Sequence, residues 1–295
     1  MSKTARPFRS LLYIPGSKKR ALEKAQTLPA DGIIFDLEDA VGVDEKDSAR
    51  QQVADVLTNF DFGNRSLMVR VNGFETNWIN DDLDIICAAA PAAILLPKVR
   101  WGADIVRLSE YLDANPNTAE TRIWAMMESP LSVLNAQEIA ASSPRLQGMV
   151  LGTNDLIKDL NARHTASRAP VHTSMEICLL AARAYGLICI NGVYNAFRDG
   201  DGLRRMCQQD RDMGYDGKSL IHPSQIEIAN EIFAPSKDDL ELAKRQIAAF
   251  EQARSQGQGI AVLDGSIVEY LHIVAAKSLL AKAEAIVDLN SDGIT

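Results

Sequence analysis

The sequence predicts an α/β protein built on a (β/α)8 TIM barrel with a C-terminal helical extension. Eight short apolar runs recur along the chain, each bounded by turn residues and separated by helix-like stretches. The apolarity within each run is continuous rather than alternating, which is typical of parallel strands buried on both faces. Polar residues gather just after these runs, where the βα loops of a barrel form the active-site mouth.

The eight runs are interpreted as the barrel strands in chain order, and the segments between them as crossover helices. An open doubly wound sheet is the alternative, but such a sheet does not require an eighth strand, whereas a closed barrel does. The strands are expected at Leu11–Ile14, Gly32–Phe35, Leu67–Val71, Ala93–Leu96, Ile123–Met127, Gly148–Leu151, Leu187–Ile190 and Lys218–Ile221. Clear helical patterns cover Lys18–Leu28, Glu45–Thr58 and Ser132–Ala141.

The pattern changes after Pro223, so residues 1–223 are expected to form the barrel and residues 224–295 the helical extension. This extension either covers the barrel or reaches a neighbouring subunit. Its expected elements are helices at Gln225–Phe233, Asp238–Gln256 and Val268 to about Ile286, with a short apolar run at Ile260–Leu263 and a turn at Asp264–Gly265.

Composition excludes several classes of protein. The 295 residues include 31 Lys and Arg against 39 Asp and Glu, a net charge of -8. A general attraction to nucleic acid or to an anionic membrane is therefore not expected. The four cysteines show no C-x-x-C spacing, and no apolar run approaches the length of a signal peptide core or a membrane span. A cytoplasmic protein with reduced thiols is predicted.

Two carboxylates stand at the ends of consecutive predicted strands. Glu128 follows the fifth strand and Asp155 the sixth, so they would be neighbours across the barrel mouth. Oxygen ligands without His or Cys suit Mg2+, and Mn2+ is also accepted by such ligands. The alternative interpretation is that each residue caps the helix after it. The sequence thus indicates a metal site formed by Glu128 and Asp155.

A charged group also ends the third strand. Arg70 is placed to bind a substrate carboxylate in a bidentate manner through two N–H groups of its guanidinium. A buried salt bridge to an acid of the second strand is the alternative. Asp36, Glu38 and Asp39 follow that strand, and Glu38 and Asp39 are interpreted as groups that orient waters, Arg70 or a lysine around the metal.

A short basic cluster lies near the start of the first helix, from Gly16 to Arg20 and at Lys24. Cations near a helix start can hold phosphates, although a solvated helix face is the commoner role for such a cluster. The glycine spacing of a nucleotide-hydrolysing P-loop is absent.

With these residues, the chain resembles the HpcH/HpaI aldolase and citrate lyase β-subunit superfamily, in its branch of citrate-lyase-like CoA-ester lyases. The resemblance runs in order from Arg9 to about Glu284. The matching segments are Arg9–Gly16, Asp36–Val41, Arg70–Asn72, Leu96–Lys98, Glu128–Pro130, Gly152–Leu156 and Asp216–Pro223.

The resemblance implies a barrel that assembles as a homotrimer or a dimer of trimers and uses Mg2+. It assigns Glu128 and Asp155 as metal ligands and Arg70 to the keto-acid carboxylate. It also implies that a CoA thioester is bound. The residues that match the CoA-contacting positions of the family are Tyr13, Arg20, Lys24, Ser219 and Leu220.

One segment departs from the family pattern. A C-terminal G-x-M-I/V-D segment supplies a catalytic aspartate to the neighbouring subunit in the family, whereas this chain has Gly265 to Glu269, with glutamate at the last position. Glu269 is therefore expected to act as the acid/base, and its longer side chain argues against the thioester hydrolysis that some members add.

We therefore expect a Mg2+-dependent carbon–carbon lyase. It would cleave a 3-hydroxy-dicarboxylyl-CoA, such as citramalyl-CoA or malyl-CoA, to acetyl-CoA and pyruvate or glyoxylate, so its partners would be a CoA thioester and a small keto acid. Three alternatives remain. They are a pyruvate-type aldolase that needs no CoA, a citrate lyase β subunit acting on a carrier-bound citryl group, and a non-catalytic subunit of a complex.

Overall fold

A computed structural model describes residues 6–291 of the chain. The described residues divide into two compact units, one comprising Phe8–Glu231 and the other comprising residues 6–7 with residues 232–291. The predicted boundary between residues 223 and 224 lies slightly earlier in the chain and stays a prediction. Each unit is described separately below.

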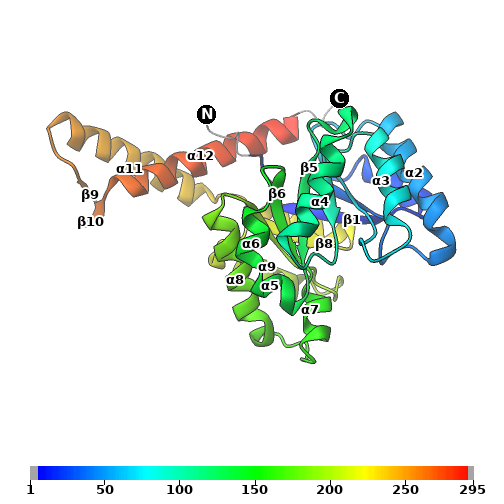
Figure 1. The fold of residues 1–295 in the computed structure, drawn as a ribbon. Helices are drawn as coiled ribbons and strands as arrows, with labels where there is room; N and C mark the ends of the chain where they lie inside the picture. The colour runs from blue at the N-terminus through cyan, green and yellow to red at the C-terminus, as the bar shows by residue number, and fades with distance from the viewer. Residues whose placement is uncertain (1–5, 292–295) are drawn as a thin grey trace. The chain divides into compact units, whose positions relative to one another are not determined.

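The first unit is a closed barrel of eight parallel strands, which confirms the predicted TIM barrel (Figure 1). Every strand pairs with its neighbours in chain order, and β8 closes the ring on β1. The strands are β1 (Ser10–Pro15), β2 (Gly32–Asp36), β3 (Ser66–Arg70), β4 (Ala93–Leu96), β5 (Arg122–Met127), β6 (Leu146–Leu151), β7 (Ile188–Asn191) and β8 (Gly217–Leu220).

Helices connect and surround these strands. The α-helices are α1 (Lys19–Ala25), α2 (Lys46–Asn59), α3 (Ile79–Ala88), α4 (Gly102–Asp113), α5 (Pro130–Leu134), α6 (Ala136–Ala141), α7 (Thr153–Asp159), α8 (His172–Ala184), α9 (Gly200–Met213) and α10 (Ile226–Phe233). Short 3-10 helices are η1 (Val43–Glu45), η2 (Pro116–Thr118), η3 (Ala169–Val171) and η4 (Pro223–Gln225).

The barrel interior is filled by apolar side chains from alternate strand positions. Trp124 of β5 is fully buried, and its ring centroid lies 5.1 Å from that of Phe8. Gly148 on β6 makes room for the indole, since a Cβ there would lie 2.7 Å from ring carbons. The polar residues of the site follow these apolar positions at the carboxyl ends of the strands.

The predicted helix at Ser132–Ala141 is instead two helices, α5 and α6, which meet at Asn135. The first begins earlier than predicted because Ser129 caps it, accepting a bond from the Ser132 N–H, and Pro130 occupies its first turn. The Asn135 side chain donates to the Arg100 carbonyl. This long-range bond accompanies the break and could not be inferred from local spacing.

The second unit contains two long helices that lie side by side, with a β-hairpin at one end (Figure 1). Its elements are α11 (Lys237–Ser255), β9 (Ala261–Leu263), β10 (Ser266–Val268) and α12 (Tyr270–Ser291). The hairpin turn is Asp264–Gly265, and both residues have positive φ. A small core of Phe250, Ala261 and Ile273 holds the helices to the hairpin.

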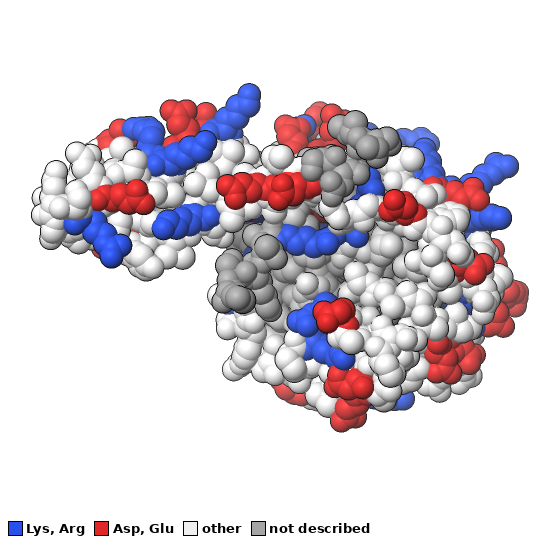
Figure 2. Space-filling view, turned by 90° about the horizontal axis from the view of Figure 1, so that it is seen from above, with Lys and Arg blue, Asp and Glu red and all other residues white. Residues whose placement is uncertain are grey.

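The four cysteines are free and buried. Among the residues that the structure describes, no helix combines the length and the apolarity needed to cross a membrane. On the face that Figure 2 shows, acidic and basic side chains are interspersed, and no broad basic patch appears among the described residues of that face.

Candidate active site

A cavity of about 350 Å³ opens at the carboxyl ends of the barrel strands. It brings together three of the predicted site residues, Arg70 from β3, Glu128 after β5 and Asp155 in the first turn of α7. Apolar side chains complete its wall, among them Met126 and Leu151. These three charged residues therefore line one cavity, and their binding of one small ligand stays a prediction.

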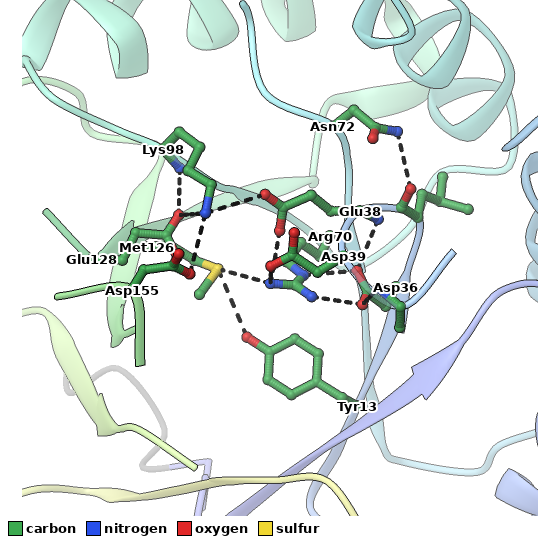
Figure 3. A network of polar contacts seen from close by, with 12 residues as sticks. Tyr13, Asp36, Glu38, Asp39, Arg70, Asn72, Lys98, Met126, Glu128 and Asp155 are labelled. Atoms are coloured by element: carbon green, nitrogen blue, oxygen red, sulfur yellow. Dashed lines mark hydrogen bonds and ion pairs between the residues drawn. The ribbon is translucent and has the colours of Figure 1, made fainter. Parts of the chain in front are cut away.

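Arg70 is held inside the site by two acids (Figure 3). Its Nε and Nη2 donate to the two carboxylate oxygens of Asp36, at 2.7 and 2.6 Å. Its Nη1 lies 2.8 Å from Oε2 of Glu38. Burial by itself lowers the pKa of Arg70, but the Asp36 carboxylate and its hydrogen bonds raise it well above the ordinary value. The guanidinium is thus a permanent, fixed cation.

Tyr13 lies under this cation. The Arg70 guanidinium carbon is 4.9 Å from the centroid of the tyrosine ring, a cation–π contact. The Tyr13 hydroxyl points to the sulfur of Met126 at 3.8 Å, and burial raises the pKa of Tyr13 above its ordinary value. Tyr13 therefore serves in this structure as a neutral platform for Arg70 and as part of the cavity wall.

A lysine that follows β4 joins the carboxylates of the site (Figure 3). The Nζ of Lys98 lies 3.2 Å from Oδ2 of Asp155, 3.4 Å from Oε1 of Glu128 and 3.6 Å from Oε1 of Glu38. The backbone N–H of Lys98 also donates to Oε1 of Glu128, at 2.7 Å. Burial lowers the pKa of Lys98, but the opposite effect of Glu128 and the other nearby acids is larger. The pKa is therefore raised above its ordinary value, and the ammonium keeps its proton.

Glu128 has the features of a ligand for a cation. It is 1% exposed, and burial raises the pKa of its carboxyl group although Lys98 opposes the shift. Its Oε2 is buried and has no hydrogen-bond partner in the described part of the chain. A buried carboxylate oxygen without a partner is costly, so a cation or a water that completes the site would stabilise it.

The donor set suits a metal that keeps part of its own water. Within residues 6–291, no group of three or more His, Cys, Asp or Glu side chains is arranged to enclose a metal. Glu128 and Asp155 supply two protein oxygens, and both lie within 3.4 Å of the same ammonium. Mg2+ binds in this manner, through one or two carboxylates with waters and substrate oxygens completing its octahedron.

The two predicted orienting acids, Glu38 and Asp39, differ in burial. Glu38 contacts both Arg70 and Lys98, and burial raises its pKa to about 7 against the opposing effect of Arg70. The carboxylate of Asp39 is more exposed and lies 3.7 Å from Arg70. Both lie within ion-pair distance of Arg70, and their role in orienting waters, Arg70 or a lysine around the metal stays a prediction.

A buried lysine holds the loop that carries these acids. The Nζ of Lys46 donates to the carbonyls of Leu37 and Glu38 and to Oδ1 of Asn72, all within 2.8 Å. Asn72 in turn donates to Asp82. Burial lowers the pKa of Lys46. The sequence did not indicate this network, because Lys46 looks like an ordinary exposed residue at a helix start.

The predicted CoA-contacting residues are spread over the β1 and β8 side of the barrel. Arg20 and Lys24 are exposed on α1, and within residues 6–291 neither forms an ion pair. Ser219 lines the cavity and donates to the Asn191 carbonyl, whereas Leu220 is fully buried. Their contact with CoA stays a prediction.

Glu269 belongs to the second unit. It is exposed, lies between β10 and α12, and donates its backbone N–H to Nδ1 of His272. Its contribution to the barrel site stays a prediction, as does the trimeric assembly that the contribution requires.

The fold and the site define a class of parallel α/β barrel with several acids and a buried arginine at its mouth. The chain belongs to the HpcH/HpaI aldolase/citrate lyase family, whose model matches residues 9–223. This membership confirms the resemblance noted from the sequence.

Three similar proteins narrow the class. The chain is 56% identical to a (3S)-malyl-CoA thioesterase of Cereibacter sphaeroides, over 97% of this chain and 98% of that one. It is 34% identical to the citrate lyase subunit beta of Leuconostoc mesenteroides, over 97% and 96% of the two chains. The crystal structure of protein CitE from Mycobacterium tuberculosis, in complex with magnesium, acetoacetate and coenzyme A, matches with a TM-score of 0.78 at 29% identity. That match covers 95% of this chain and 98% of the other.

These comparisons correct the predicted reaction. The expectation of a carbon–carbon lyase is wrong, because the relatives that share 56% of their residues with this chain are thioesterases, which are hydrolases. The inference that Glu269 argues against thioester hydrolysis is overturned with it. The prediction failed because lyases and thioesterases of one family share the barrel and its acidic mouth, so the matched motifs do not separate them.

The sequence also left two site residues without a role. Asp36 pairs with Arg70 because the two residues are directly opposite in the register of β2 and β3. In the sequence, Lys98 stands out only as the end of the family-matching segment Leu96–Lys98. A signal existed for Asp36, since an acid and an arginine that end neighbouring parallel strands are expected to meet.

Proposed function

We propose that the protein is a Mg2+-dependent thioesterase that hydrolyses (3S)-malyl-CoA or a closely related 3-hydroxy-dicarboxylyl-CoA to CoA and the free dicarboxylic acid. The 56% identity with (3S)-malyl-CoA thioesterase over nearly the whole chain carries this proposal. The cavity supports it, because an arginine and two acids face a space of about 350 Å³ that suits a malyl group.

Arg70 would bind the free carboxylate of the acyl group. Asp36 and Glu38 fix its guanidinium from one side, and the ring of Tyr13 supports its face. A cation held in this way loses little conformational freedom when it binds an anion, so the acyl group is oriented without further ordering.

Glu128 and Asp155 would hold the metal between them, as two of its oxygen ligands. When bound, Mg2+ would act as a Lewis acid toward the carboxylate and hydroxyl oxygens of the acyl group. Glu128 would remain fixed by the Lys98 N–H through its other oxygen. The apolar wall formed by Met126 and Leu151 would limit the access of bulk water.

The hydrolytic step needs a group that accepts a proton and returns it. Water would attack the thioester carbonyl carbon, forming a C–O bond, and the C–S bond would then break to release CoA. Glu269 of a neighbouring subunit is our candidate for taking the proton from the attacking water and delivering it to the departing thiolate. This role requires the homotrimer or dimer of trimers that the family resemblance implies.

The CoA moiety would extend toward α1. Arg20 and Lys24 are exposed there and can meet its phosphates, while Tyr13, Ser219 and the backbone at Leu220 would border the thioester. Binding of CoA thioesters agrees with the relative whose structure contains coenzyme A.

Product analysis tests the proposal. The purified chain is incubated with (3S)-malyl-CoA and Mg2+ in water enriched in 18O, and products are identified by mass spectrometry. We expect equimolar CoA and malate with one 18O in the newly formed carboxylate, and no turnover with EDTA. Accumulation of acetyl-CoA and glyoxylate, or of no product with any CoA thioester, would contradict the proposal.

A further inference from the structure

The most unusual backbone in the site belongs to Lys98. Its φ is +54°, in the left-handed region that residues other than Gly, Asn and Asp rarely adopt. Such strain persists only where the surroundings impose it, and it concentrates at functional positions. Here it lets one residue contact Glu128 twice, through its backbone N–H and through its ammonium.

The ammonium of Lys98 lies among three carboxylates of the site. It is within 3.6 Å of oxygens from Glu38, Glu128 and Asp155 (Figure 3). Glu128 is almost completely buried, so without a cation nearby its charge would be strongly destabilising. The Lys98 ammonium supplies such a charge, 3.4 Å from the Glu128 carboxylate.

We infer that Lys98 is a built-in counter-ion that competes with Mg2+ for Glu128 and Asp155 and so sets the affinity of the site for the metal. The inference rests on the metal site of the proposed function. Two acids that share one ammonium cannot also surround a divalent ion without repulsion between the two cations. Binding of the metal therefore requires the ammonium to move away.

The structure provides a place for the displaced ammonium. A second cavity of about 280 Å³ is lined by Lys98, by four acids and by two further cations; the acids are Glu75, Glu128, Asp155 and Asp159, and the cations are Arg100 and Lys158. Glu75 and Asp159 are exposed acids. The lysine side chain is 28% exposed, so it can turn toward them without crossing a packed core.

Titration of the purified protein with Mg2+ alone, followed by calorimetry, tests the inference without any substrate. We expect Lys98→Met to bind Mg2+ about tenfold more tightly than the unmodified chain, because the competing charge is gone. Lys98→Asn should do the same, and asparagine tolerates the left-handed backbone. The matched control is Lys19→Met, which removes an equal charge from an exposed position of α1 that lines neither cavity and should leave the affinity unchanged.

Thermal unfolding provides a second readout. Metal-free Lys98→Met should melt below the metal-free unmodified chain, because Glu128 loses its counter-ion. Saturating Mg2+ should then raise the melting temperature of the variant more than that of the unmodified chain.

The outcomes separate the two claims. If the unmodified chain binds Mg2+ and both Lys98 variants bind it equally or more weakly, the competition is disproved while the metal site stands. If neither the unmodified chain nor either variant binds Mg2+, the proposed metal site fails, and the role of Lys98 fails with it.

Discussion

Asp36 and Arg70 face each other across β2 and β3 and form two hydrogen bonds of 2.7 and 2.6 Å. The pair is buried, with side-chain exposures of 1% and 9%. It explains how an arginine can remain at the floor of an acidic cavity with a fixed direction. Of the two interpretations of Arg70 that the sequence left open, the structure shows the buried salt bridge, and binding of a substrate carboxylate by the same group stays a proposal.

Replacing one partner of this pair should be costly. Asp36→Asn leaves the guanidinium without its main counter-charge, so we expect the free energy of unfolding to fall by about 3 kcal/mol or more. Urea denaturation measures this. Asp47→Asn is the control, because Asp47 also pairs with an arginine but is exposed, and it should change stability little. Equal losses in both variants would show that burial of the Asp36 pair has no special effect.

Gly152 should be required beside Glu128. A Cβ at this position would lie 2.4 Å from the Cβ of Glu128 and 2.7 Å from its Oε2, so Gly152→Ala should displace the whole Glu128 side chain. We expect the Kd for Mg2+ to rise about tenfold, as for loss of one well-placed ligand contact. Calorimetry measures the affinity, with Gly42→Ala as the control, because its nearest neighbour would be 3.6 Å from the Cβ. An unchanged Kd in Gly152→Ala would remove Oε2 from the metal site.

The basic residues of α1 should act on CoA binding alone. Arg20→Glu and Lys24→Glu should each raise the KM for malyl-CoA about tenfold with little change in kcat, since they contact a part of the substrate that does not react. Lys19→Glu, on the same helix, has the same charge change without a proposed contact. Steady-state kinetics at low ionic strength measures the effect, and similar KM values in all three variants would disprove a local phosphate contact.

The buried cysteines should be inert in the native protein. Burial raises the pKa of Cys87 and of Cys178 from an ordinary value of 9.0 to about 12. The thiolate fraction at pH 8 is therefore minute, and a disulfide reagent should react with these thiols only after unfolding. The folded state holds these protons where the unfolded chain has lost them, so the free energy of unfolding should fall as pH rises from 9 toward 12. Fast labelling of native protein, or stability that rises over this range, would contradict the burial of these thiols.

The barrel could be predicted from the sequence because its strands are buried on both faces and so form continuous apolar runs. Helix ends were also close, as with α11, predicted at Asp238–Gln256 and observed at Lys237–Ser255. The break at Asn135 was missed, because it accompanies a hydrogen bond to a residue far away in the chain.

The site was predicted in part. Glu128, Asp155 and Arg70 converge as expected because each follows a parallel strand of the same barrel. A salt bridge from Arg70 to an acid of the second strand was one of two interpretations, but the choice of Asp36 among those acids depends on strand register. The position of Lys98 depends on a left-handed backbone, which local sequence does not specify. The reaction was predicted incorrectly because the resemblance covers both thioesterases and lyases, and it does not separate the two reactions.

The central claim is that thioester hydrolysis depends on a metal held by Glu128. The most direct measurement is the rate of CoA release from (3S)-malyl-CoA by Glu128→Gln, with Mg2+ present and circular dichroism verifying the fold. We predict a fall of about a thousandfold or more together with loss of Mg2+ binding, because a neutral amide replaces the buried charged ligand. A folded Glu128→Gln protein that binds Mg2+ and hydrolyses malyl-CoA at the unmodified rate would contradict the claim.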